Sequence, residues 1–139
     1  MGELLYSSTR GGESGCTASE AVLKGLAKDG GLFMPERIPR FDFALPELKD
    51  ASYQEVAYRV MRLLLTDYSE EELRTCIEGA YDEKFDTPEI APLTFADDAY
   101  YLELFHGKTI AFKDMALSIL PYLMTTAAKK NGVTNKIEI

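Results

Sequence analysis

The pattern of apolar and polar residues predicts three helices within the first 85 residues. Each helix start carries a Ser or Thr followed three residues later by Glu, a capping box that satisfies free backbone N–H groups. The three pairs are Thr17 with Glu20, Ser52 with Glu55, and Ser69 with Glu72. Apolar residues then recur at the spacing of one helical face. The chain is therefore predicted to start helices at these three positions.

Glycines and a short link indicate where these helices end. The first apolar stripe is followed by Lys28 and then by Gly30-Gly31, which we expect to stop the helix in a left-handed turn. Only Thr66-Asp67-Tyr68 separates the second helix from the third. Because a short connection places consecutive helices side by side, residues 52–85 are predicted to form an antiparallel helix pair.

Short strands and one further helix are predicted in the remaining segments. The strand candidates cover residues 4–7, 32–34, 93–95 and 100–105, and the last two flank an acidic turn at Asp97-Asp98. A helix is predicted from about residue 111 to residue 130, kinked or divided at Pro121. Its apolar face would contain Phe112, Ala116, Ile119, Leu120 and Leu123. The chain ends within an apolar segment at residues 136–139 that is predicted to be a strand, so we expect it to be part of a longer protein.

Together these elements predict an α/β protein in two parts. The chain is helical and acidic to about Phe85 and becomes richer in strands after a linker that contains Pro88 and Pro92. We place one domain at residues 1–95 and a second at residues 96–139. The second should be only partly supported, because the sheet neighbours that would cover its apolar helix are missing. We expect that exposed face to drive self-association, while the sequence leaves the oligomeric state open.

Composition restricts the possible partners. The 139 residues include 15 basic and 23 acidic ones, for a net charge of -8, which disfavours binding to a nucleic-acid backbone. No run approaches the roughly 20 apolar residues of a membrane-spanning helix, and the first residues lack the features of a secretion signal. We therefore expect a cytoplasmic protein that binds neither nucleic acid nor membrane.

The cysteines and the histidine do not predict a metal site. Cys16 and Cys76 lack the paired spacing of metal ligands, which favours free buried thiols. His106 is the only histidine of the sequence, so a histidine cluster cannot form within this chain. It could donate to a ligand or cap its own turn, and the structural role is favoured.

Residues 104–115, which read LFHGKTIAFKDM, hold the densest group of reactive side chains. The segment passes from a strand through a glycine turn into a helix start, where α/β proteins commonly bind ligands. Lys108 and Lys113 lie at or before that start, where the helix dipole disfavours a cation. With burial against Phe105 and Phe112, this placement would favour a free amine that attacks a carbonyl. On spacing alone, a lysine that extends into solvent is the favoured alternative.

Two glycine-containing segments are not predicted to hold nucleotide phosphates. Gly107-Lys108-Thr109 resembles the end of a P-loop, but that loop requires a glycine where this chain has Leu102. The run from Arg10 to Gly15 carries a cation, but Glu13 opposes a phosphate, so a flexible turn is favoured.

Three segments together resemble threonine synthase. They read YSSTRG at residues 6–11, TASEAVLKGLAKDGGLFMPE at 17–36 and ELFHGKTIAFKDMAL at 103–117. The resemblance implies an enzyme of fold type II that depends on pyridoxal 5'-phosphate (PLP), with residues 96–139 as the beginning of its cofactor domain. It also implies that Lys113 holds PLP as a Schiff base and that Phe112 packs near the cofactor ring.

The implied reaction converts O-phospho-L-homoserine and water to L-threonine and phosphate. Lys108 and Arg10 are candidates for binding the substrate phosphate. The chain departs from the family at Lys108, where proline is usual, and it lacks the family's glycine-rich loop for the cofactor phosphate. We therefore expect this chain alone to bind PLP weakly or not at all and to be inactive.

Two alternatives stay open at this point. A threonine-synthase-like phospho-lyase would share the lysine motif but eliminate phosphate to give a keto acid, and product analysis of the full-length protein would separate the two. A non-catalytic helical domain for docking or assembly would carry Lys113 as an ordinary solvated lysine. A lack of aldehyde reactivity at Lys113 would favour that alternative.

Overall fold

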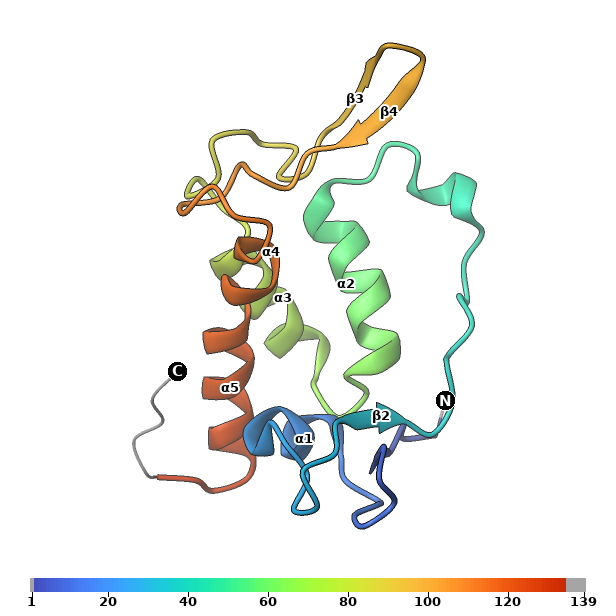
Figure 1. The fold of residues 1–139 in the computed structure, drawn as a ribbon, viewed down its shortest axis with the longest axis vertical. Helices are drawn as coiled ribbons and strands as arrows, with labels where there is room; N and C mark the ends of the chain where they lie inside the picture. Colours follow the sequence, from blue (N-terminus) through green and yellow to red (C-terminus); the bar gives the residue numbers. More distant parts are fainter. Residues whose placement is uncertain (1, 135–139) are drawn as a thin grey trace.

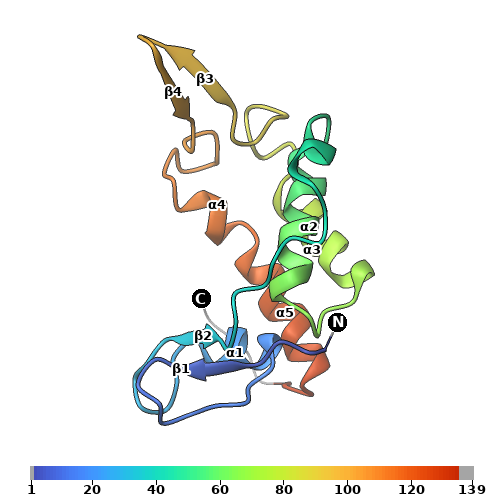
Figure 2. The ribbon, with the colours of Figure 1, turned by 90° about the vertical axis from the view of Figure 1, so that its right-hand side faces the viewer.

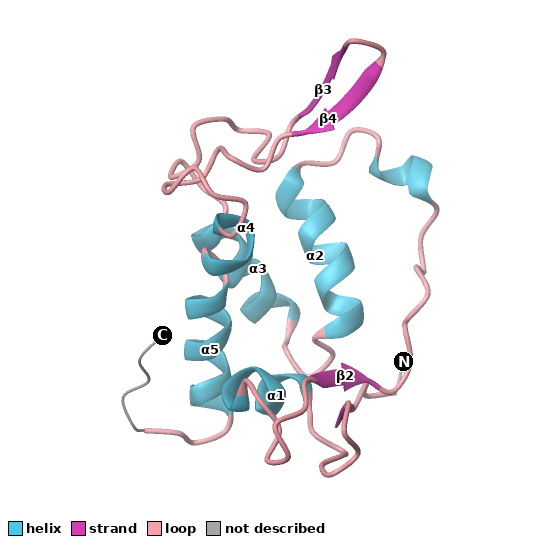
Figure 3. Ribbon diagram, in the orientation of Figure 1, coloured by secondary structure: helices cyan, strands magenta, loops and turns pink. Residues whose placement is uncertain are grey.

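Helices occupy the middle of the structure and two small sheets lie at its opposite ends (Figures 1 and 3). The computed structural model describes residues 2–134, so the strand predicted at residues 136–139 lies outside the described residues. The elements are, in chain order, β1 (Tyr6–Ser8), α1 (Ala18–Lys24), β2 (Phe33–Pro35), a 3₁₀ helix η1 (Leu45–Leu48), α2 (Tyr53–Leu64), α3 (Glu70–Ala80), β3 (Leu93–Ala96), β4 (Ala99–Leu102), α4 (Asp114–Leu117) and α5 (Leu120–Lys130).

All three predicted helix starts are confirmed. The hydroxyls of Thr17, Ser52 and Ser69 each accept a hydrogen bond from the backbone N–H three residues later. In α1 and α3 the glutamate bonds back to the capping residue and completes the box. Glu55 of α2 instead pairs with Arg59 and Arg74, so this cap is one-sided.

The predicted end of the first helix is wrong. Helix α1 stops at Lys24, and Gly25 follows with a φ of 67° while its N–H donates to the carbonyl of Ala21. Gly25 has no Cβ that would clash at this positive φ, so the helix ends there. Gly30-Gly31 lies instead in a tight loop whose two sides meet in a bridge between Leu26 and Leu32.

Helices α2 and α3 form the predicted antiparallel pair. The side-chain amide of Gln54, at the start of α2, donates to the carbonyl of Tyr81, directly after α3. Apolar side chains of α3 face the core of the molecule because they recur at helical spacing. The buried residues of α3 are Leu73, Cys76, Ile77 and Ala80.

The helix predicted at residues 111–130 is divided, as expected, although the break lies just before Pro121. Pro121 occupies the first turn of α5, where its missing N–H costs no helical hydrogen bond. The expectation that this helix would be only partly covered is wrong for its second half, because α5 packs against α1 and α3 (Figures 1 and 2). Leu123 and Ala127 are buried there, whereas Phe112 is 67% exposed and does not share their covered face.

Each sheet has two antiparallel strands. β1 pairs with β2, and β3 pairs with β4 across Asp97 and Asp98, so the predicted acidic hairpin is confirmed. Residues 103–105, predicted as part of the last strand, lie beyond β4. Figure 2 shows that the β3–β4 hairpin projects away from the helices. Its exposed apolar side chains are Leu93, Phe95, Tyr100, Tyr101 and Leu102.

The cysteines and the apolar character of the helices were also considered in the sequence predictions. Cys16 and Cys76 are free and buried, as predicted. Among residues 2–134, no helix has the length and apolar character to cross a membrane.

Candidate active site

Lys113 lies on the wall of an open apolar cavity of about 530 Å³. The wall is built from the start of α2, from the loop before β3, from the end of β4 with the segment after it, and from α4 with the two residues before it. The lining residues are Tyr53, Ala91, Leu102, Leu104, Phe112, Lys113, Met115, Ala116 and Leu117. Among these described residues, Lys113 alone carries a charge. Lys113 is therefore the one residue with a primary amine in the described lining, which is otherwise uncharged.

The predicted burial of Lys113 against Phe105 and Phe112 is wrong. Lys113 is exposed, and so are Phe112 and Phe105, by 67% and 50% of their surfaces. Phe105 does not line the cavity and instead packs against the ring of His106 at a centroid distance of 4.6 Å. These residues belong to an irregular segment between β4 and α4. Phe112 does line the cavity beside Lys113, and its predicted role near a cofactor ring stays a prediction.

The turn that leads to Lys113 is closed by Asp114. Its Oδ2 accepts a hydrogen bond from the backbone N–H of Thr109 at 2.7 Å, and its Oδ1 accepts one from the Thr109 hydroxyl at 2.6 Å. These bonds from Thr109 lower the pKa of the Asp114 carboxyl. Gly107 allows the close approach, because a Cβ at this position would overlap the side chain of Asp114. No sequence pattern predicted this contact.

His106 joins the end of the β3–β4 segment to the loop after α3. Its Nδ1 lies 2.5 Å from a carboxylate oxygen of Asp86, and its Nε2 lies 2.7 Å from one of Glu103. Hydrogen bonds to Glu103 and then to Asp86 raise the pKa of His106. The backbone N–H of Asp86 also donates to the carbonyl of His106. These contacts agree with the favoured structural role for this residue.

Neither candidate for binding the substrate phosphate lines the Lys113 cavity. Arg10 follows β1, and its guanidinium donates to the backbone carbonyl of Asp29 at 2.9 Å. The β1–β2 sheet lies at the opposite end of the molecule from the hairpin (Figure 1). Lys108 is exposed at the glycine turn. The structure does not bring Arg10 to the cavity, and a phosphate contact by either residue stays a prediction.

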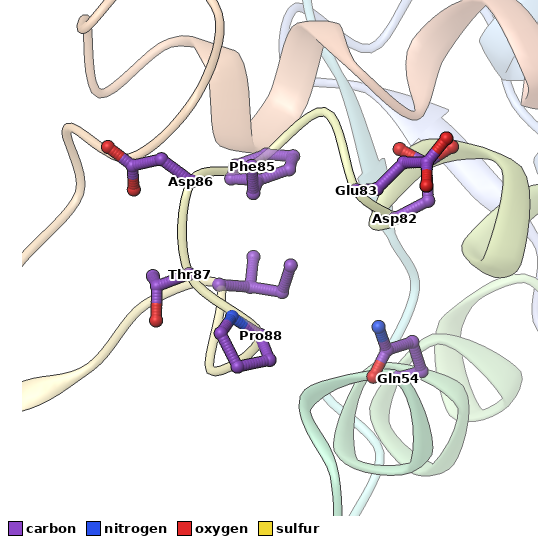
Figure 4. A pocket seen from close by; sticks show the side chains of 8 residues that line it. Gln54, Asp82, Glu83, Phe85, Asp86, Thr87 and Pro88 are labelled. Atoms are coloured by element: carbon purple, nitrogen blue, oxygen red, sulfur yellow. The ribbon is translucent and has the colours of Figure 1, made fainter.

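A second cavity, of about 450 Å³, is acidic (Figure 4). Asp82 and Glu83 lie at one end of it and Asp86 lies at the other. Gln54 contributes an amide, and the lining described by the structure contains no cation, so the surface disfavours an anionic ligand. Within residues 2–134, no group of three or more His, Cys, Asp and Glu side chains could hold a metal ion.

Comparison with known proteins establishes the family. The family model described as "Threonine synthase N terminus" matches residues 5–81. The chain belongs to the threonine synthase family. Lys113 lies outside the matched residues, so its role is a separate question.

Individual relatives extend the likeness over most of the chain. Threonine synthase of Schizosaccharomyces pombe is 44% identical over 135 residues, which cover 94% of this chain and 26% of that protein. Human threonine synthase-like 1 is 38% identical over 110 residues, which cover 76% of this chain and 15% of that protein. The crystal structure of PLP-bound threonine synthase from Brucella melitensis matches with a TM-score of 0.82 at 33% identity, over 93% of this chain and 28% of that one.

These relatives also bear on the fold class and on the extent of the chain. The match to a PLP-bound threonine synthase confirms the predicted α/β class with its link to fold type II PLP enzymes. The chain spans 26% of the S. pombe protein and 28% of the B. melitensis structure.

Proposed function

We propose that this chain forms the amino-terminal part of a PLP-dependent threonine synthase, which converts O-phospho-L-homoserine and water to L-threonine and phosphate. Residues 96–139 would begin its cofactor domain, and Lys113 would bind PLP covalently. The observation that carries the proposal is that Lys113 lines an otherwise uncharged apolar cavity, in a chain that belongs to this family.

The residues present fit the attachment of PLP and the environment of its ring. A primary amine matches the aldehyde of the cofactor, and the side chains of Phe112 and Met115 offer apolar surface to an aromatic ring. The residues present do not provide a site for the cofactor phosphate, because the described lining contains no second cation and the sequence has no glycine-rich phosphate loop. We propose that the remaining length of the enzyme supplies those contacts.

Residues of this chain would then carry out proton transfer and exclude water from the cavity. When bound, PLP supplies an electron sink for negative charge at substrate carbons. Nζ of Lys113 would move protons at those carbons, since a lysine amine at a cavity wall serves as a general acid and base. Leu102 and Leu104 would exclude water from the same cavity.

A titration with PLP tests the proposal in this chain and in a full-length protein that contains it. Borohydride reduction followed by peptide mapping should place the cofactor on Lys113 of the full-length protein, with little or none on the chain alone. Lys113→Arg should abolish this labelling, whereas the matched variant Lys108→Arg should retain it. Absence of cofactor from Lys113 in the full-length protein would contradict the proposal and favour a non-catalytic docking domain.

A second candidate reaction is elimination of phosphate to give a keto acid, as in a threonine-synthase-like phospho-lyase. The 38% identity to threonine synthase-like 1 favours keeping this candidate. Product analysis of the full-length protein separates the two reactions. Threonine as the product supports the first proposal, and a keto acid without threonine supports the second.

A further inference from the structure

The backbone just before Lys113 has an unfavourable conformation at Ile110. Its φ is 62°, in the left-handed region that L residues avoid and that β-branched residues avoid most strongly. The Ile110 side chain is 74% exposed, so its own packing does not explain this conformation. Such strain persists only where the surrounding contacts impose it.

The N–H of Ile110 donates to the carbonyl of Gly107, and the contacts on either side of Ile110 lead to Asp114. Thr109, which precedes Ile110, donates both its backbone N–H and its hydroxyl to the Asp114 carboxylate. The N–H of Asp114 in turn donates to the carbonyl of Ala111 at 3.0 Å. Residues 110–113 therefore lie in a loop whose two ends, Thr109 and Asp114, are joined by two hydrogen bonds.

Lys113 is held from its other side by α4. Its carbonyl accepts hydrogen bonds from the N–H groups of Ala116 and Leu117, at 3.0 and 2.8 Å. Its backbone thus has contacts on both sides that restrict it, although its side chain is exposed. Asp114 is only 6% exposed, and a carboxylate buried to this extent is costly unless its hydrogen bonds are satisfied, as they are here.

We infer that Asp114 is a positioning residue, which closes the turn of residues 107–113 and thereby directs Lys113 at its cavity. This inference rests on the proposed function, in which Lys113 binds PLP. Holding a reacting amine in one place lowers the entropy that must be lost when it reacts. Loss of the Asp114 carboxylate should therefore slow the attachment of PLP to Lys113 without removing the reacting group.

The first arm of the test measures amide hydrogen exchange in this chain and does not involve the cofactor. Asp114→Ala should speed exchange of the Thr109 amide roughly tenfold, the effect of losing one hydrogen bond to a charged group. Asp50→Ala removes a carboxylate that is exposed and should leave that exchange unchanged. Unchanged exchange in Asp114→Ala would overturn the proposed closure of the turn.

The second arm measures the rate at which reduction traps PLP on Lys113 in the full-length protein. Asp114→Ala should lower this rate roughly tenfold, by loss of the same interaction. Thr109→Val should lower the trapping rate less than Asp114→Ala does. Thr109→Ser should keep the rate of the unmodified protein, because serine retains both the backbone N–H and the hydroxyl donor. Thr17→Ala weakens the distant cap of α1 and should leave the rate unchanged, which separates positioning from a general loss of stability.

The possible failures are distinguishable. If Thr109 exchange becomes faster while trapping on Lys113 is unchanged, Asp114 has a structural role alone and the inference is wrong. If the unmodified full-length protein never carries PLP on Lys113, the proposed function fails instead, and the exchange data still decide whether Asp114 holds the turn.

Discussion

The hydroxyl of Tyr81, directly after α3, donates a hydrogen bond of 2.7 Å to the backbone carbonyl of Met115 in α4. Tyr81 is 3% exposed, and its ring packs edge-on against Tyr53 at a centroid distance of 4.9 Å. One side chain thus connects the residues that match the family model to the segment that contains Lys113.

Removal of this hydroxyl should destabilise the protein. Tyr81→Phe leaves the Met115 carbonyl without this donor, so the free energy of unfolding should fall by about 1–2 kcal/mol. Urea unfolding followed by circular dichroism measures the change. Tyr101→Phe is the matched control, because Tyr101 is 51% exposed, and it should change the free energy by less than about 0.5 kcal/mol. Equal changes in the two variants would contradict the importance of the Tyr81 bond.

The cap of α1 offers a second test of stability. Thr17→Ala removes the hydroxyl that accepts from the N–H of Glu20 and should lower the free energy of unfolding by about 1 kcal/mol. Thr75→Ala makes the same chemical change at an exposed position inside α3 and should be neutral or slightly stabilising, because alanine favours a helix interior. A loss of stability in Thr75→Ala as large as in Thr17→Ala would count against the capping explanation.

The position of His106 predicts a pH dependence. Glu103 and Asp86 raise its folded-state pKa above the ordinary value of 6.5, so the charged ring stabilises the folded state. This contribution is fully present below pH 6.5 and is lost as the pH rises through the higher folded-state pKa. The stability difference between the unmodified protein and His106→Gln should therefore be larger at pH 6 than in the alkaline range.

A proton NMR titration measures the pKa directly, since His106 is the only histidine. Glu103→Gln should bring the midpoint down towards 6.5, whereas Asp50→Asn, at an exposed position, should leave it unchanged. A midpoint at or below 6.5 in the unmodified protein would show that the two carboxylates do not act on His106 as the structure indicates.

Relief of the strain at Ile110 should stabilise the protein. Glycine adopts a φ of 62° without a Cβ clash, and the exposed side chain of Ile110 contributes little packing. Ile110→Gly should therefore raise the free energy of unfolding by about 0.5–1 kcal/mol, after the entropy cost of glycine is subtracted. Ile38→Gly, at a residue that is 86% exposed and has no positive φ, should be destabilising or neutral. Destabilisation by Ile110→Gly would show that the packing of the Ile110 side chain outweighs the strain at this position.

The elements that were predicted correctly depend on neighbours in the chain. A cap such as Ser69 acts on a backbone group three residues away, and the Asp97-Asp98 turn joins strands that are adjacent in sequence. Such interactions involve residues only a few positions apart, so the helix starts and the β3–β4 hairpin can be predicted from residue types and spacing. The predicted role of Lys113 rests on the resemblance of a longer segment to threonine synthase, whereas residue spacing alone favoured a solvated lysine at this position.

The remaining features depend on residues that are distant in sequence or on which surface is covered. Leu123 and Ala127 of α5 are buried because α5 meets α1 and α3, whereas Phe112 stays exposed at the edge of the cavity. His106 reaches Asp86 across 20 positions of the sequence. Burial and long-range hydrogen bonds are properties of the assembled packing, and a local pattern states only which residues are able to take part. The helix starts and the hairpin could therefore be assigned before folding was considered, while the cavity wall around Lys113 exists only once these segments have met.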